Sequence, residues 1–306
     1  MIGAARVGLV AGAALIALAA FDAPIDATAS YPEGPLYLDG RLYYAEMGAD
    51  RVSMIVGGAK RTFWREAGCG PTAMAPYGDD LAILCHEGER FAIVSRAGKT
   101  LGHVGLQPGE VFARTPVGAP NDGYSDGRGG VYYSDPGPFS KQSTPRGAVM
   151  RLGADGAVTR LAGGLWYPNG IYHHASSRTL YVSEHLARRI LAFPVLADGT
   201  LGPAKTYAKI DDIAPKPTTP FYAEAGVDGL EMAPNGDIVV ALYGEGRLIQ
   251  IDPQGRLRRV IPVPFPYVTN VAFAPNGDAA VVGAFINDRP PFRGQVIRLP
   301  AATFGN

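Results

Sequence analysis

The chain has 306 residues, 47% of them hydrophobic, and its 28 lysines and arginines balance 28 aspartates and glutamates. A chain of this length can bury a substantial core, and its balanced charge gives no reason to expect nucleic acid or an anionic membrane as a partner. Its 40 glycines and 26 prolines predict frequent turns, which suit many short strands better than long helices.

Residues 1–20 differ in composition from the rest of the chain. Arg6 and the amino terminus supply positive charge, residues 7–20 are apolar, and Ala17 and Ala19 are small residues suited to cleavage. The pattern predicts a secretory signal peptide, and therefore a periplasmic or secreted protein without membrane contact after cleavage. The alternative is an N-terminal helix or membrane anchor that is retained, although the apolar run is shorter than the ~20 residues of a comfortable span.

Two cysteines flank one predicted hairpin. Cys69 lies just before residues 71–74, and Cys85 ends the apolar run 81–85. An oxidising compartment permits a disulfide between them. Two buried free thiols fit equally well, because the sequence does not give the Cα separation that a disulfide needs.

The rest of the chain repeats one pattern, in which a polar residue and a glycine precede a hairpin. Glu33, Asn121, Asn169 and Asp228 each introduce such a hairpin. The five residues at 233–237 also recur unchanged at 274–278, between apolar strands. A period near 40 residues with four short strands in each unit indicates a β-propeller.

Six repeat units can be counted. They cover residues 33–65, 71–104, 121–162, 169–210, 228–263, and from 270 onward. The sixth unit has three clear strands, so we expect residues near 21–25 to supply its fourth and to close the ring without an open edge. This predicts an all-β, six-bladed propeller as a single domain over residues 21–306; a pair of β-sandwiches would not explain the even spacing.

The polar residues of the repeats predict a metal site. The innermost strand of each blade lines the central channel, so a residue just before it lies at one mouth. Glu33, Asn121, Asn169 and Asp228 would meet there and offer only oxygen atoms, which suit a divalent cation such as Ca²⁺ and argue against a nitrogen- or sulfur-ligated zinc site. Taken singly, each of these residues also fits an ordinary turn or surface position.

Other candidates follow from the hairpins. The second strand of each blade returns to the same mouth, which brings further side chains to the pocket rim. His86 and His185 are the candidates for proton transfer, with packing at the rim as the alternative. The candidates for substrate binding are Glu46, Asp135 and Tyr243.

These motifs resemble the regucalcin (senescence marker protein)/gluconolactonase-like family of six-bladed propellers. The resemblance extends over residues 31–300, and the motifs that carry it lie at residues 33–35, 119–123, 131–136, 167–171, 227–230 and 269–273. It implies that Glu33, Asn121, Asn169 and Asp228 bind one divalent metal. It also implies hydrolysis of sugar lactones or other cyclic esters. One departure is Ala119, which stands where regucalcin-like members carry an arginine.

The function expected from this resemblance is a metal-dependent lactonase. The cation would polarise the ring carbonyl, and either Asp228 or the cation would activate water. Hydrolysis of a phosphotriester or fluorophosphate at the same site is one alternative, and a non-catalytic propeller that binds a ligand is another. We expect a small-molecule lactone as partner and a monomer or small homo-oligomer.

Overall fold

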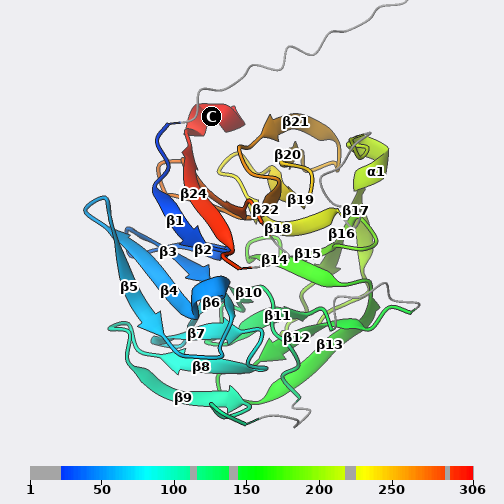
Figure 1. Ribbon diagram of the computed structural model, residues 1–306. Helices are drawn as coiled ribbons and strands as arrows, with labels where there is room; N and C mark the ends of the chain where they lie inside the picture. Colours follow the sequence, from blue (N-terminus) through cyan, green and yellow to red (C-terminus); the bar gives the residue numbers. More distant parts are fainter. Residues whose placement is uncertain (1–21, 111–115, 138–143, 218–224, 287–289, 306) are drawn as a thin grey trace, which may run out of the picture.

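A computed structural model describes residues 22–110, 116–137, 144–217, 225–286 and 290–305, so the predicted signal peptide lies outside it. These residues form six four-stranded antiparallel sheets arranged around a common axis (Figure 1). The predicted all-β, six-bladed propeller is confirmed. No helix within the described ranges has the length and apolar character required to cross a bilayer.

Blades 1 to 3 follow one another in the chain, and each begins with its innermost strand. Blade 1 contains β2 (Pro32–Leu38), β3 (Arg41–Glu46), β4 (Arg51–Val56) and β5 (Ala59–Arg65). Blade 2 contains β6 (Pro71–Tyr77), β7 (Asp80–Cys85), β8 (Arg90–Val94) and β9 (Thr100–Gly105). Blade 3 contains β10 (Gly123–Ser125), β11 (Val131–Asp135), β12 (Gly147–Leu152) and β13 (Val158–Leu165).

Blades 4 to 6 continue this order. Blade 4 contains β14 (Pro168–His174), β15 (Thr179–Glu184), β16 (Arg189–Pro194) and β17 (Lys205–Lys209). Blade 5 contains β18 (Gly226–Met232), β19 (Ile238–Tyr243), β20 (Arg247–Ile251) and β21 (Leu257–Pro262). Blade 6 contains β22 (Tyr267–Phe273), β23 (Ala279–Ala284), β24 (Arg293–Leu299) and β1 (Asp26–Ser30). The short helices are η1 (Met47–Ala49), α1 (Ile210–Ile213) and η2 (Ala301–Phe304).

Strand β1 closes the ring. It pairs antiparallel with β24, with Ser30 opposite Arg293, so the expectation that an N-terminal segment completes blade 6 is confirmed. The strand begins at Asp26, just after the predicted residues 21–25. The contacts of Asp26 fix the start of the strand. Its carboxylate accepts a hydrogen bond from the Tyr44 hydroxyl at 2.8 Å and pairs with Lys60 at 2.7 Å.

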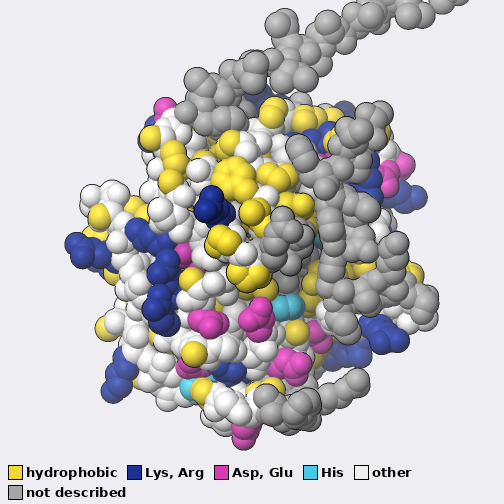
Figure 2. Space-filling model, viewed as in Figure 1, with side chains coloured by type: hydrophobic (Ala, Val, Ile, Leu, Met, Phe, Trp, Pro, Cys, Tyr) yellow, Lys and Arg dark blue, Asp and Glu magenta, His cyan; other side chains and the backbone are white. Residues whose placement is uncertain are grey.

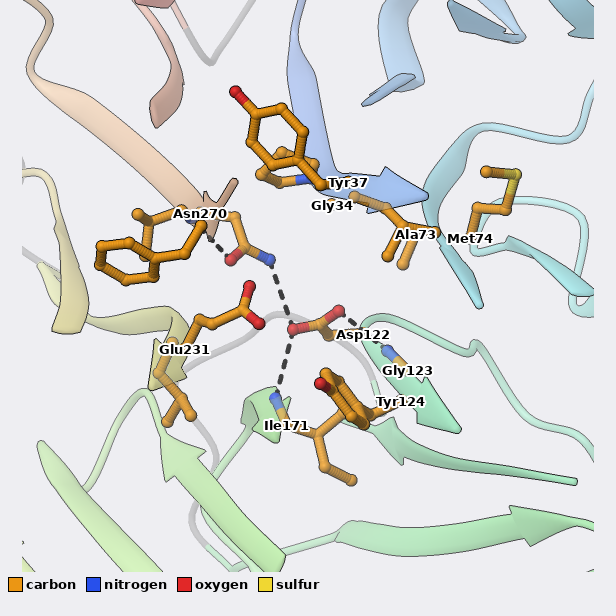
Figure 3. A pocket seen from close by; sticks show the side chains of 15 residues that line it. Gly34, Tyr37, Ala73, Met74, Asp122, Gly123, Tyr124, Ile171, Glu231 and Asn270 are labelled. Carbon is orange, nitrogen blue, oxygen red and sulfur yellow. Dashed lines mark hydrogen bonds between the residues drawn. The ribbon is translucent and has the colours of Figure 1, made fainter. Parts of the chain in front are cut away.

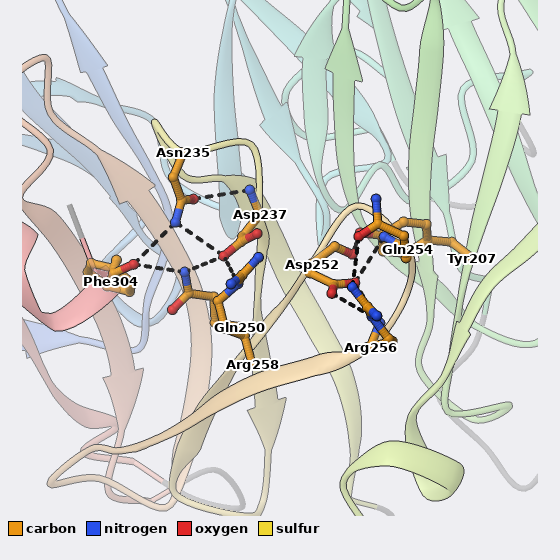
Figure 4. Close-up of polar contacts among 9 residues, drawn as sticks. All are labelled: Tyr207, Asn235, Asp237, Gln250, Asp252, Gln254, Arg256, Arg258 and Phe304. Carbon is orange, nitrogen blue, oxygen red and sulfur yellow. Dashed lines mark hydrogen bonds and ion pairs between the residues drawn. The ribbon is translucent and has the colours of Figure 1, made fainter.

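The repeated sequence at 233–237 and 274–278 forms the same turn twice. In each copy the asparagine side chain accepts a hydrogen bond at 3.1 Å from the backbone N–H of the aspartate two residues later. In the first copy, Asn235 and Gln250 also donate hydrogen bonds to the backbone carbonyl of Phe304, at 3.2 and 2.9 Å (Figure 4). The first copy therefore fixes the C-terminal helix η2 to blade 5.

Glycines allow the innermost strands to approach closely at the axis. Neighbouring innermost strands contact one another around the ring. A Cβ added to Gly170 would lie 2.6 Å from the backbone oxygen of Asp228, and one added to Gly229 would overlap the side chain of Asn270. A Cβ on Gly34 would likewise collide with the Thr72 carbonyl. Only glycine fits at these three positions.

The residues before these glycines lie at irregularities of their strands. The pairing of the first two strands shifts register between Glu33 and Leu36, between Pro168 and Ile171, and between Val227 and Leu230. Glu33, Asn169 and Asp228 thus lie inside their strands, whereas the sequence pattern placed them just before; Asn121 does precede its strand. Such bulges redirect side chains away from the regular alternation of a sheet.

The two cysteines form a disulfide, which decides between the two alternatives left open by the sequence. Cys69 and Cys85 are bonded, with their Cα atoms 4.5 Å apart. Cys85 ends β7 and Cys69 lies shortly before β6, so the bond joins the beginning of blade 2 to the end of its second strand.

Candidate active site at the channel mouth

Two carboxylates from different blades, Glu33 and Asp228, meet near the axis. Asp228 is 4% exposed. Burial and the negative charges of Asp228 and Asp122 raise the pKa of Glu33 well above its ordinary value. Burial and the charge of Asp122 do the same to the pKa of Asp228. Negative charge is therefore concentrated here, and a bound cation would relieve its repulsion.

Ser134 joins the backbones of the two asparagines. Its carbonyl oxygen accepts a hydrogen bond from the N–H of Asn121 at 2.9 Å, and its hydroxyl donates to the carbonyl oxygen of Asn169 at 2.6 Å. Ser183 repeats the second bond by donating to the carbonyl oxygen of Asp228 at 2.7 Å. These hydroxyls fix the strand ends that carry the expected ligands.

Glu33 is fixed from the neighbouring blade 6. The hydroxyl of Thr269 in blade 6 donates to the carbonyl oxygen of Pro32 at 2.8 Å, and it also forms a hydrogen bond to the carboxylate of Glu33. Each of these hydroxyls comes from the blade that precedes its acceptor, so the mouth is held by bonds between blades.

The donor set fits a hard cation. Among the residues that the structure describes, no group of three or more His, Cys, Asp or Glu side chains could hold a metal ion. The expected ligands include only two such residues, Glu33 and Asp228, and require the amide oxygens of Asn121 and Asn169 to complete the set. Carboxylate and amide oxygens are ligands that Ca²⁺ accepts, and the two repelling carboxylates supply the charge that would attract it.

Asp122, which the sequence analysis did not select, occupies the channel itself. It accepts hydrogen bonds from the N–H groups of Gly123 and Ile171, at 2.8 and 3.2 Å, and from the side-chain amide of Asn270 at 3.3 Å (Figure 3). Burial raises its pKa to about 6. The spacing offered one clue, since Asp122 stands between Asn121 and the glycine that in the other motifs follows the ligand directly.

A cavity lies around Asp122, and its lining begins at Gly34, just after Glu33 in the chain. It has a volume of about 110 Å³ and is lined by residues that follow the expected ligands in sequence, among them Tyr37, Tyr124 and Glu231. Burial and the charge of Asp122 raise the pKa of Glu231 to about 8, and its carboxyl group faces Asp122 in Figure 3. The channel thus continues inward from the mouth as an acidic cavity.

Two of the predicted substrate-binding residues have structural partners. Glu46 is fully buried and accepts hydrogen bonds from Arg51, Ser53 and Lys60 at 2.9, 2.6 and 3.0 Å. Asp135 accepts the backbone N–H groups of Ala119 and Gly137, at 3.3 and 3.2 Å. Glu46 holds together the strands of blade 1, and Asp135 supports the loop that leads to Asn121. These contacts favour a supporting role for both residues over contact with substrate.

The two predicted proton-transfer histidines both lie at the mouth. Burial lowers the pKa of His86, although its hydrogen bonds to the backbone of Pro120 and Ala119 oppose this. Within the described ranges its Nδ1 is buried without a hydrogen-bond partner. His185 is 2% exposed, and its ring packs between those of Tyr167 and Tyr243, with centroids 5.8 and 5.7 Å away.

Tyr243, the third predicted substrate-binding residue, contacts a residue that the sequence analysis did not select. Its hydroxyl lies 2.8 Å from the hydroxyl of Tyr31. Burial, Tyr243 and the charges of Glu33 and Asp228 raise the pKa of Tyr31 well above its ordinary value. Tyr31 therefore lies close to both carboxylates, and it links the aromatic residues of the rim to the expected metal ligands.

Comparison with protein families gives a match over most of the chain. The family described as "SMP-30/Gluconolactonase/LRE-like region" matches residues 31–282. No curated protein matches the sequence.

Three solved structures with the same fold have similar TM-scores and sequence identities to this chain. A luciferin-regenerating enzyme has a TM-score of 0.72 at 19% identity, covering 90% of this chain and 93% of that one. A gluconolactonase from Xanthomonas campestris has a TM-score of 0.68 at 20% identity, covering 90% and 89%. Regucalcin from Agrobacterium tumefaciens, a calcium-binding protein, has a TM-score of 0.72 at 21% identity, covering 91% and 93%. At these identities the likeness establishes the fold.

Proposed function

Because the chain belongs to the SMP-30/Gluconolactonase/LRE-like family, we propose that it is a divalent-metal-dependent hydrolase that opens a lactone ring. The observation that carries this proposal is the meeting of Glu33 and Asp228 at the mouth, where each carboxylate lies within a concentration of negative charge. The gluconolactonase and the calcium-binding regucalcin among the similar structures support the same reaction class and the same kind of cation.

The proposed ligands of the cation are Glu33, Asn121, Asn169 and Asp228, and the proposed cation is Ca²⁺, which takes oxygen ligands of this kind. When bound, it would polarise the lactone carbonyl and stabilise the negative charge that develops on the carbonyl oxygen. The hydroxyls of Ser134, Ser183 and Thr269 hold the ligand backbones in place, which limits the reorganisation needed on binding.

Asp228 is the proposed base. One of its carboxylate oxygens would accept a proton from the water that attacks the lactone carbonyl. The ring C–O bond then breaks, and the departing ring oxygen takes up a proton. His86 and His185 are the proposed donors of that proton, because both lie at the mouth and a neutral imidazole can pass a proton from one nitrogen to the other.

We also propose that the protein is exported, as the composition of residues 1–20 indicates. The disulfide between Cys69 and Cys85 supports this proposal, because such bonds persist in oxidising compartments and are rare in the cytosol.

The reaction is tested with purified protein, two lactones (δ-gluconolactone and δ-valerolactone) and a phosphotriester, before and after removal of metal by a chelator. We expect hydrolysis that is lost on chelation and restored by Ca²⁺. Lactone turnover that persists in protein shown to be metal-free by elemental analysis would reject the metal requirement. Turnover of a phosphotriester but of no lactone would assign the site to the other substrate class, and turnover of neither would leave a binding function.

A further inference from the structure

One side of the mouth is an arc of aromatic rings that runs across three blades. Tyr167 and His185 come from blade 4, Tyr243 from blade 5 and Tyr267 from blade 6. The ring of His185 lies 5.8 Å from Tyr167 and 5.7 Å from Tyr243, and Tyr243 lies 5.2 Å from Tyr267. These rings therefore form one continuous layer, in which Tyr167, His185 and Tyr243 are buried and Tyr267 is half-buried.

Tyr31, which leads into blade 1, joins the arc to the carboxylates. Its hydroxyl lies 2.8 Å from that of Tyr243, and its ring packs edge-on against Phe292, with centroids 6.0 Å apart. Tyr31 also precedes Glu33 by only two residues in the chain. A molecule bound at the two carboxylates would therefore lie beside the arc.

The surface next to the arc is also apolar. Phe265 packs edge-on against Phe285, whose side chain is 38% exposed. Figure 2 shows hydrophobic side chains gathered around one basic side chain over the region where Figure 1 labels β18, β22 and β24, with acidic side chains and a histidine beside them. An exposed apolar patch on a soluble protein commonly marks a binding surface.

Five blades begin their third strand with an arginine, and four of these arginines are engaged within the blades. Four arginines that begin the third strand of a blade each pair with a carboxylate of the same or a neighbouring segment. The pairs are Arg51 with Glu46, Arg90 with Glu66, Arg189 with Glu184, and Arg247 with Glu245. These four cations already have partners, whereas Arg293, which begins β24, is exposed and forms no ion pair with a described residue.

We propose that the aromatic arc binds the ring substituent of the substrate, and that the substrate is a lactone with an apolar substituent rather than a polyhydroxylated sugar lactone. This inference rests on the proposed function. The lactone carbonyl would lie at Glu33 and Asp228, and an alkyl or aryl substituent would extend over Tyr31 and Tyr267, the two half-buried rings. A sugar lactone would instead place several hydroxyl groups against ring faces, which cannot replace their hydrogen bonds to water.

The preference is measured with δ-hexalactone and δ-decalactone, which share the ring and the type of leaving oxygen and differ by four methylenes. Each fully buried methylene is expected to raise kcat/KM about 4-fold. The arc would cover only one side of the substituent. We therefore expect the kcat/KM of the Ca²⁺-loaded protein to be about 10-fold higher, or more, for δ-decalactone than for δ-hexalactone. Both lactones should also exceed δ-gluconolactone. Equal values for the two alkyl lactones would overturn the inference and leave the proposed function intact.

Variants of Tyr31 and Tyr267 test whether these rings cause the preference for the longer substituent. Tyr31→Ser and Tyr267→Ser should reduce the ratio of kcat/KM for δ-decalactone over δ-hexalactone at least 3-fold, whereas Tyr31→Phe, which keeps the ring, should retain most of it. Tyr77→Ser is the matched control, because the Tyr77 hydroxyl bonds to the Gly153 carbonyl, outside the arc; its ratio should be unchanged. A ratio that is unchanged in both Tyr31→Ser and Tyr267→Ser would contradict the proposal that these rings bind the substituent.

Binding of inert analogues keeps the inference testable without turnover and without variants. The lactams that correspond to the two lactones, 6-methyl- and 6-pentyl-2-piperidinone, are titrated into wild-type protein by calorimetry. We expect the pentyl compound to bind about 10-fold more tightly. Equal affinities would overturn the inference. If neither lactone is hydrolysed but the pentyl lactam still binds more tightly, the proposed reaction fails while the apolar subsite stands.

Discussion

At the scale of single residues, the glycines that follow the expected ligands determine how closely the blades meet. The sequence pattern of a polar residue followed by glycine is also typical of turns. In the structure, however, Gly170 and Gly229 lie within strands, where a Cβ would strike the innermost strand of the next blade. The polar residue and its glycine thus act together, since one carries the oxygen and the other lets the strands converge.

Gly229→Ala should therefore destabilise the protein. The added Cβ would overlap the Asn270 side chain, and overpacking of this kind costs about 1–3 kcal/mol. Urea denaturation of the variant is compared with that of Gly102→Ala, because a Cβ on Gly102 meets no atom within 4 Å. We expect a lower unfolding free energy for Gly229→Ala alone; equal values for the two variants would show that the axis can expand.

The sequence offered a reason to select four expected ligands but no means to predict what surrounds them. Repetition of one hairpin singled out Glu33, Asn121, Asn169 and Asp228 as expected ligands, because equivalent positions in a ring of blades face the same axis. Asp122 and Tyr31 escaped this reasoning. Asp122 enters the channel through the local path of a loop, and Tyr31 reaches the mouth because β1 joins blade 6 to blade 1.

At the scale of elements, the disulfide holds together the beginning and end of the first hairpin of blade 2. Replacing both cysteines, as Cys69→Ser with Cys85→Ser, should lower the unfolding free energy by about 3 kcal/mol, the value expected for a loop of this size. The loop spans a sequence separation of 16 residues. Wild-type protein kept in reductant should match the double variant in urea denaturation, and a loss below about 0.5 kcal/mol would contradict this account.

The channel strand β18 carries Glu231, whose pKa predicts a dependence of stability on pH. Burial raises the pKa from 4.5 to about 8, so between these values the folded protein retains a proton that the unfolded chain has lost. The stability that this group contributes is complete below pH 4.5 and is lost as the pH rises through 8.

Glu231→Gln, which resembles the protonated form, should remove this dependence. In chelator, the urea midpoint of the wild type should fall more between pH 6 and pH 9 than that of the variant. Asp212→Asn, a change at an exposed position outside the channel, should behave as the wild type does. Parallel curves for wild type and Glu231→Gln would show that the carboxyl group is already ionised in the folded protein.

At the scale of the whole molecule, β1 closes the propeller by bringing the two ends of the chain into one blade. The sequence predicted this closure because blade 6 lacked a strand. The strand could not be located to the residue, since its position depends on the contacts of Asp26 with Tyr44 and Lys60 in blade 1. Contacts between segments far apart in the chain leave no local pattern.

A variant that begins at residue 31 should consequently be unstable, in comparison with one that begins at residue 22. Loss of β1 exposes the edge of β24, and an open edge invites pairing with other chains. We expect a reduced urea midpoint and concentration-dependent association in light scattering. A monodisperse variant with the stability of the longer chain would show that the ring does not depend on β1.

The most direct test of the proposed site compares lactone hydrolysis by Asp228→Asn and Asn169→Ala as the concentration of Ca²⁺ rises. Asp228 supplies both negative charge and the proposed base, so its variant should retain less than about 1% of wild-type kcat even with saturating Ca²⁺, since a general base contributes at least about 100-fold. Asn169 supplies a neutral oxygen, so excess Ca²⁺ should restore much of the activity of its variant. Near wild-type kcat for Asp228→Asn at saturating Ca²⁺ would contradict the assignment of Asp228 as the base.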